Sequence, residues 1–306
     1  MMSFLPEGFM INTKENITRL SSFEEFNRAF IENAPIEARA EVCDCNHNLH
    51  IDFGFIEGII PREECATGIS DGTTRDIAII SRVNKPVRFL IDDIRVENGK
   101  KVAYLSRRKL QQLYLDNYLS CRIPGDILDA TVTHLEPFGA FCDIGCGINA
   151  LLPIDSISVS RIPHPNVRFC NGDNIKAVIK GFDPLGRALL SHKELLGTWE
   201  ENAALFKAGE TVSGIVRSVE SYGVFIELTP NLSGLAEYSS NVQEGDFASV
   251  YIKSIIPEKL KFKLVIIDSF AAEYKKEKPR YFISEGHIDY FRYSPKNATK
   301  IIETAF

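Results

Sequence analysis

Several features that often identify an enzyme or a membrane protein are missing from this chain of 306 residues. No apolar run of about eighteen residues occurs, so no membrane-spanning helix is expected. Residues 1–17 lack the basic, apolar and small-residue pattern of a secretory signal. No phosphate-loop, post-strand GxGxxG or HExxH motif occurs, and no GxSxG nucleophile elbow is expected. We therefore expect a cytoplasmic protein that is not an enzyme and uses no cofactor or small-molecule substrate.

Paired cysteines and positive charge are scarce as well. The seven cysteines include no CxxC pair, so a zinc or iron–sulfur site is not expected; reduced thiols are, with Cys142 turned inward. The net charge of −6 excludes coating of duplex DNA by charge alone. A local strip of Arg and Lys beside aromatic rings can still hold single-stranded RNA, because stacking on a base contributes about 1–3 kcal/mol whatever the net charge.

The chain is organised around residues 134–145, with the sequence HLEPFGAFCDIG. In a strand, Ala140, Cys142 and Ile144 share one face, and Phe141 and Asp143 share the other. A charged residue is rarely buried without a partner, so we expect the face of Phe141 to be in water. Packing does not explain a phenylalanine ring on a face in water, so we expect Phe141 to have a function there.

A second ring, Phe138, lies three residues before Phe141. Regular alternation would place the two rings on opposite faces. We expect a bulge at Gly139 to turn both the same way. Two aromatic rings on a solvated sheet form a stacking platform.

This pattern recurs 84 residues later, as the numbers of Phe138 and Tyr222 show. Around the second occurrence, Val224, Ile226 and Leu228 are expected to point inward, and Phe225 and Glu227 outward. The closing strands, 186–191 and 260–265, are 74 residues apart, so the later copy is about ten residues shorter. The missing length falls in the connection that spans 156–169 in the earlier copy.

At these residues the sequence resembles tandem S1 RNA-binding domains, as in a short bacterial form of the ribosomal protein S1 family. Residues 124–193 carry a Gly-Asp start, Phe-Gly-Ala-Phe, Asp-Ile-Gly, Leu-Leu, a second Gly-Asp and a Gly-Arg-x-x-Leu-Ser-x-Lys close, and residues 207–268 a recognisable version. The resemblance implies a mainly β fold of tandem five-stranded OB-fold barrels joined by short helices, with a small α+β C-terminal extension. It also implies that single-stranded RNA is the ligand.

Carried over by position, the resemblance assigns RNA-binding residues to both copies. The family histidine is replaced by Pro153 and Glu237, and Pro257 stands where the third copy would have its Asp. Lysines on neighbouring strands extend a positive track. The predicted RNA-binding residues are Phe138, Phe141, Asp183, Arg187, Lys176 and Lys180 in one copy, and Tyr222, Phe225, Lys253, Lys261 and Lys263 in the other. An ion pair between Asp183 and Arg187 is the structural alternative, and it could also orient the arginine.

Residues 36–109 read as a degenerate first copy in which His47 and His50 stand near the aromatic positions. We favour a structural or protein-binding module there over RNA stacking. A metal site formed by these histidines with Asp44 or Asp52 is a weaker alternative.

Short helices and loops are expected between the modules. A helix with a Ser22/Glu25 capping box should dock on the first copy. The basic cluster Arg107–Lys109 should be a solvated surface, with phosphate contact as the alternative. The predicted divisions are 1–35, 36–109, a linker helix 110–123, 124–193, a linker helix 194–206 around an inter-domain Trp199, 207–268, and an extension 269–306 containing a charged linker, 275–280.

The loop 156–169 offers Arg161, His164 and Arg168 beside the second copy.

Three functions fit the whole pattern. The first is a protein of translation that holds mRNA near the small ribosomal subunit. The second is a non-catalytic adaptor that docks on a ribosomal or degradation complex, and the third is a decay or processing accessory that presents RNA to a nuclease. Exposed Phe141 and Phe225 favour the first and third.

Overall fold

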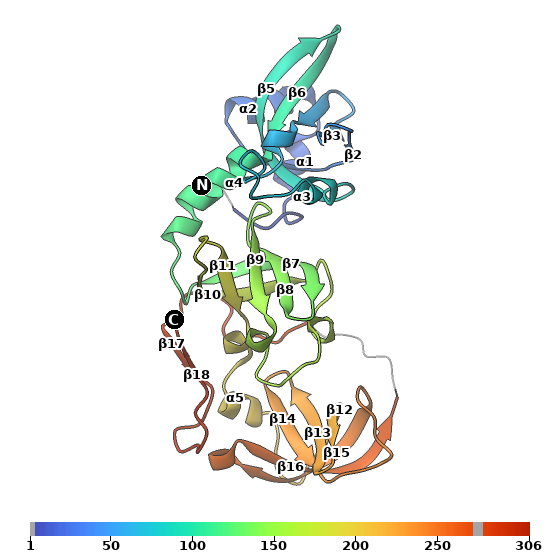
Figure 1. The fold of residues 1–306 in the computed structure, drawn as a ribbon, viewed down its shortest axis with the longest axis vertical. Coiled ribbons are helices and arrows are strands. Elements are labelled where there is room, and N and C mark those ends of the chain that lie inside the picture. Colours follow the sequence, from blue (N-terminus) through green and yellow to red (C-terminus); the bar gives the residue numbers. More distant parts are fainter. Residues whose placement is uncertain (1–3, 272–277) are drawn as a thin grey trace. The chain divides into compact units, whose positions relative to one another are not determined.

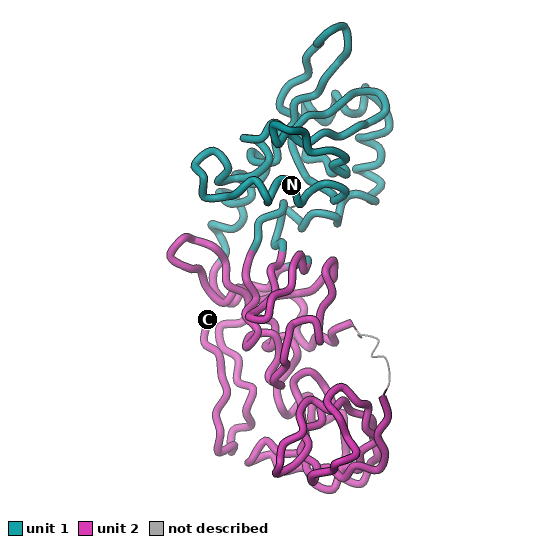
Figure 2. The backbone as a smooth tube through the Cα atoms, turned by 45° about the vertical axis from the view of Figure 1, so that its right-hand side comes forward, with its two compact units in different colours: residues 1–122, 129–131, 143–149 teal, residues 123–128, 132–142, 150–306 magenta. Residues whose placement is uncertain are grey.

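The computed structural model describes residues 4–271 and 278–306, and its strands form three modules in sequence (Figure 1). The chain divides into two compact units (Figure 2). One is Met1–Arg122 with Asp129–Thr131 and Asp143–Asn149, and the other is Ile123–Leu128 with Val132–Cys142 and Ala150–Phe306. The prediction of a mainly β fold with five-stranded barrels is confirmed. No helix in the described part of the chain is long and apolar enough to cross a membrane.

The first module is a six-stranded sheet in the order β1-β5-β6-β4-β3-β2. Strands β1 and β2 are consecutive in the chain, yet β1 pairs with β5 and β2 pairs with β3. They are two halves of one broken strand, so the strand order is that of a five-stranded barrel whose first strand is divided. The strands are β1 (Ile36–Arg39), β2 (Val42–Cys43), β3 (Leu49–Asp52), β4 (Glu57–Ile60), β5 (Pro86–Glu97) and β6 (Lys100–Ser106).

Helix α2 (Phe23–Ile31) closes the core of this module, as predicted. Its N-cap Ser22 accepts a hydrogen bond from the Glu25 backbone N–H, and Phe26 is fully buried, 4.9 Å from the ring of Phe53. The other helical segments here are α1 (Lys14–Arg19), η1 (Arg62–Glu64) and α3 (Ile77–Ile80).

Helix α4 (Arg107–Asn117) begins with the basic cluster, and the expectation of a solvated surface there is wrong for Arg107 but holds for exposed Lys109 and, in part, for half-buried Arg108. Arg107 is buried and forms an ion pair with Glu7 at 2.6 Å. Arg108 pairs with Glu64 at 2.7 Å, and Lys109 pairs with Asp92. The partners neutralise all three charges, so phosphate contact at this cluster is not favoured.

The second and third barrels are closed and share one topology, with the third and fifth strands of each pairing in parallel. The second barrel is β7 (Ile127–Glu136), β8 (Gly139–Asp143), β9 (Asn149–Pro153), β10 (Asn174–Phe182) and β11 (Ala188–Ser191). The third is β12 (Thr211–Glu220), β13 (Gly223–Thr229), β14 (Leu232–Ala236), β15 (Phe247–Ile256) and β16 (Lys261–Phe270). Short 3-10 helices η2 (Leu119–Cys121), η3 (Ile154–Ser156), η4 (Pro165–Val167) and η6 (Pro257–Lys259) lie in the connections.

The junction between these barrels is a broken helix, η5 (Lys193–Leu196) followed by α5 (Trp199–Ala203). Gly197 separates the two with a positive φ of 84°, which glycine adopts without strain. Trp199 is buried and packs edge-on against Phe262 of β16, with ring centroids 5.7 Å apart. Its predicted role as a packing residue is confirmed.

The C-terminal extension, which ends in the hairpin of β17 (Tyr290–Arg292) and β18 (Glu303–Ala305), is bonded to both barrels of its unit. The Ile288 N–H donates to the Gly125 carbonyl beside the second barrel. The Tyr293 hydroxyl donates to the Asn231 carbonyl of the third barrel. This extension therefore acts as a strap across the two barrels. Part of the predicted charged linker, 275–277, lies outside the described residues.

Candidate nucleic-acid interface

Each closed barrel carries one pair of aromatic rings in the same geometry. Phe138 is 55% exposed, and its ring centroid lies 6.1 Å from that of half-buried Phe141 at an interplanar angle of 89°. Tyr222 is 68% exposed and lies 6.1 Å from half-buried Phe225 at 85°. In each pair, one ring stands in water and the second supports it edge-on.

The exposed rings come from two-residue turns and not from the strands. Phe138 lies in the turn between β7 and β8, and Tyr222 lies in the turn between β12 and β13, where Glu220 pairs with Gly223. The predicted bulge at Gly139 is therefore wrong, because Phe138 never enters a strand. A tight hairpin turn already carries its side chains beyond the sheet.

A glycine follows the ring in both turns because another strand passes close by. A Cβ on Gly139 would lie 2.5 Å from the Leu152 carbonyl oxygen, and a Cβ on Gly223 would lie 2.5 Å from that of Ala236. Real Cβ atoms do not approach backbone oxygen so closely. The residue after each exposed ring must therefore be glycine, because the closed barrel leaves no room for a side chain next to the ring pair.

The inward faces follow the predicted alternation. Ala140 and Cys142 are fully buried, as are Val224 and Ile226. Leu228 is only half-buried. The expectation that Asp143 and Glu227 make the outer face wet is wrong, because both carboxylates are buried.

Asp143 is held by backbone donors. One oxygen accepts from Gly145 N–H at 2.8 Å and Gly147 N–H at 3.0 Å, and the other accepts from Glu7 N–H at 2.8 Å. Burial, together with the nearby Glu7 charge, raises the pKa of Asp143 to about 7. This carboxyl is part of a buried network and takes no part in a solvated platform.

Glu227 joins the third barrel to the loop of the second. It accepts two hydrogen bonds from Arg168, at 2.5 and 2.6 Å, and two from Arg217, at 3.0 Å each. Burial alone would raise the pKa of Glu227, but the two guanidinium groups outweigh it and lower that pKa. Arg168, predicted as a loop cation, is therefore occupied in this pair.

The remaining predicted residues of the second barrel lie on β10 (Lys176 and Lys180) and in the turn between β10 and β11 (Asp183 and Arg187). Asp183 accepts from the backbone N–H groups of Leu185 and Arg187, at 2.9 Å each, and pairs with the Arg187 guanidinium at 2.7 Å. The hydrogen bonds from Arg187 lower the pKa of Asp183. Arg187 stays 69% exposed, so the turn holds the arginine while its outer edge faces solvent. Lys180 donates to the Ser156 hydroxyl at 3.2 Å, and Lys176 is half-buried.

In the third barrel the rings and lysines share a face. Phe225 pairs with Leu235, which pairs with Lys263, so the three lie in one row across β13, β14 and β16. Lys261 is two residues before Lys263 on the same strand and is exposed. Lys253 is exposed at a register shift in β15, outside this row.

A cleft of about 840 Å³ opens over this ring pair. Its size lies within the range of ligand-binding pockets. Tyr222, Phe225 and Lys261 line it, together with Arg161 from the loop of the second barrel and Lys300 from the C-terminal strap. Sequence reasoning proposed Arg161 but missed Lys300, which stands in a segment without a recognised motif.

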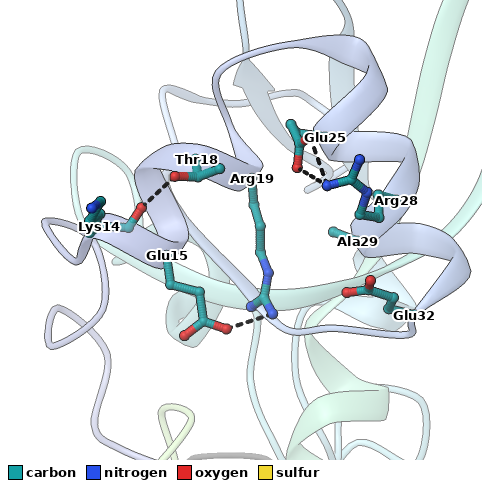
Figure 3. Close-up of a pocket in the computed structure, with 8 residues that line it drawn as sticks. All are labelled: Lys14, Glu15, Thr18, Arg19, Glu25, Arg28, Ala29 and Glu32. Atoms are coloured by element: carbon teal, nitrogen blue, oxygen red, sulfur yellow. Dashed lines mark hydrogen bonds and ion pairs between the residues drawn. The ribbon is translucent and has the colours of Figure 1, made fainter.

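A different groove, of about 520 Å³, lies on the first module between α1 and α2 (Figure 3). Its arginines face acidic partners: Arg19 pairs with Glu15 at 2.6 Å and Arg28 with Glu25 at 2.9 Å. Lys14 and Glu32 complete a balance of three basic and three acidic residues. This groove lacks the excess positive charge that a phosphate backbone needs.

Both histidines of the first module lie beside carboxylates, and His50 is hydrogen-bonded to them. His50 contacts Asp44 and Glu57, each at 3.1 Å, and His47 lies 3.8 Å from Asp76. Within 4–271 and 278–306, no group of three or more His, Cys, Asp or Glu side chains is placed to hold a metal.

Residues 68–72, GISDG, do have the GxSxG spacing. They lie in consecutive turns between η1 and α3, with Ser70 exposed. A nucleophile elbow requires a strand-to-helix turn, so the local structure does not match that site.

Comparison with known proteins identifies the class to which the second barrel belongs. A family model described as the S1 RNA binding domain matches residues 123–193, the segment that carries the first ring pair. The second barrel is therefore similar to the S1 RNA binding domain.

The chain is similar in sequence to curated proteins that are forms of one ribosomal protein. It is 28% identical over 219 residues to small ribosomal subunit protein bS1 of Leuconostoc lactis, covering 70% of this chain and 49% of that one. It is 28% identical over 239 residues to bS1 of Staphylococcus aureus strain COL, with 76% and 58% covered. A bS1 homolog of Bacillus cereus is 32% identical over 152 residues, with 48% and 40% covered. The chain spans about half the length of the curated relatives it matches.

Among solved structures, a multidomain protein with nucleic acid binding domains from Streptococcus pneumoniae matches 77% of this chain and 74% of its own, at 12% identity. The TM-score is 0.26. A score this low supports no conclusion about function.

Proposed function

We propose that the protein binds single-stranded RNA, including mRNA, through the second and third barrels, in the manner expected of a ribosomal protein S1 relative. The repeated ring pair carries this proposal. Two barrels present an exposed ring supported edge-on at 6.1 Å, although neither ring is needed to fill a core. Base stacking on such rings is tolerant of sequence and contributes about 1–3 kcal/mol per base.

The proposed role is non-catalytic and cytoplasmic, with the small ribosomal subunit as the partner. We assign RNA binding to residues 124–193 and 207–268. Residues 36–109 serve as a structural or docking module, because the positions equivalent to the rings hold His47, which lies 3.8 Å from Asp76, and His50, which is hydrogen-bonded to two carboxylates. Sedimentation with purified small subunits, with and without RNase treatment, tests the partner assignment.

Filter binding of a labelled pyrimidine-rich oligonucleotide tests the RNA proposal. Phe138→Ala with Phe141→Ala, and Tyr222→Ala with Phe225→Ala, should each weaken binding at least tenfold at every salt concentration, because stacking is lost. Phe270→Ala is the matched control, since Phe270 is 53% exposed on the third barrel but does not line the cleft. Equal affinity for wild type and both ring variants would remove the basis of the proposal.

A further inference from the structure

We propose that the RNA site of the third barrel is composite: Arg161 from the loop of the second barrel and Lys300 from the C-terminal strap bind the phosphates of a strand stacked on Tyr222. This inference rests on the proposed RNA function and extends it to residues outside the barrel. It gives the strap a binding role besides its structural one.

The cleft holds more positive than negative charge. Four exposed cations line it, Arg161, Lys259, Lys261 and Lys300, against the two acids Glu220 and Glu244. Among the described residues, none of these four cations forms an ion pair. Arg217 also lines the cleft, but it is paired with Glu227. The four cations therefore stand unneutralised beside an aromatic ring, the combination that single-stranded nucleic acids require.

The segment bearing Lys300 is fixed on both sides. The Thr299 N–H donates to the Glu258 carbonyl at 2.8 Å, and the Ile302 N–H donates to the Ser294 hydroxyl at 2.9 Å. Lys300 lies between these two anchors. Its backbone is therefore held in place before any ligand arrives, which reduces the entropy lost on binding.

Arg161 is held in a similar way. The preceding Val159 N–H donates to the Asn231 side-chain oxygen at 3.0 Å, and the Ser160 hydroxyl hydrogen-bonds to that of Ser233 at 2.8 Å. Both partners belong to the third barrel. The loop thus brings a guanidinium from the second barrel to the ring pair of the third.

The salt dependence of RNA affinity provides the test. On single strands each lost phosphate contact lowers the slope of log K against log salt by about 0.7 and weakens binding about fivefold near 0.1 M salt. We expect this change for Arg161→Ala and for Lys300→Ala, and about twice the slope change for the double variant. Lys300→Arg should keep the wild-type slope. Lys296→Ala is the control, because Lys296 is exposed on the same strap but does not line the cleft.

The outcomes separate this inference from the RNA function. A wild-type slope and affinity for the double variant, with weakened binding by Tyr222→Ala/Phe225→Ala, would overturn the composite site and leave RNA binding by the barrel intact. An equal loss for Lys296→Ala would also overturn it, since the effect would then be general charge. Unchanged binding in every variant, rings included, would overturn the RNA function itself.

Discussion

Loss of the Glu227 carboxylate should destabilise the third barrel strongly. The side chain is 4% exposed, and its partners Arg168 and Arg217 are 8% and 12% exposed. Glu227→Gln removes the negative charge and leaves two guanidinium groups in a nearly dry site. Removing one member of a buried ion pair costs about 3–5 kcal/mol, because the other charge stays buried without compensation.

Trp199 offers a direct measurement of this effect. It is the only tryptophan, and its ring packs against Phe262 of the third barrel, so its fluorescence reports unfolding of that barrel. With a urea slope of about 1.5 kcal/mol per M, a loss of 3 kcal/mol lowers the midpoint by about 2 M. Glu237→Gln is the control, since Glu237 is exposed just after β14. A shift below about 0.5 M for Glu227→Gln would refute the burial argument.

Three further perturbations should affect stability. Gly139→Ala and Gly223→Ala should each cost about 1–3 kcal/mol in urea unfolding, because the new methyl meets a carbonyl oxygen, whereas Gly181→Ala, which faces open space, should cost much less. Burial lowers the pKa of His192 to about 4 in the folded protein. Between about pH 4 and 6.5, His192 is therefore protonated in the unfolded chain but neutral in the folded one. The contribution of His192 to stability should be constant above that window and fall by about 3 kcal/mol as pH drops through it; an unchanged pH slope in His192→Gln would contradict this. Asn231→Ala should lower the fluorescence-detected melting temperature by at least about 8 °C, because its side chain bonds Val159, Lys193 and Gly197; an unchanged value would show that the junction does not depend on it.

Local alternation was enough to predict the barrel interiors. Ala140, Cys142, Val224 and Ile226 point inward because side-chain direction in a strand depends only on neighbouring residues. The repeat predicted both ring pairs for the same reason, since the spacing of aromatic, glycine and phenylalanine lies within one hairpin.

Burial of the carboxylates could not be predicted from the same pattern. Asp143 is satisfied by a backbone N–H 136 residues away, and Glu227 by an arginine 59 residues away. A strand pattern carries no information about such distant partners. The cleft could not be predicted for the same reason, because Lys300 is distant in the sequence and lines the cleft only where the C-terminal strap places it.

The position of Phe138 and Tyr222 at hairpin tips separates the proposed RNA contacts from the residues that fold each barrel. Neither side chain fills an interior, so the ring type can change while the module keeps its architecture. The chain already holds a phenol at one tip and a benzyl group at the other. Under the proposed RNA function, each tip is therefore an independent position at which evolution or a protein engineer can adjust the preference for particular bases.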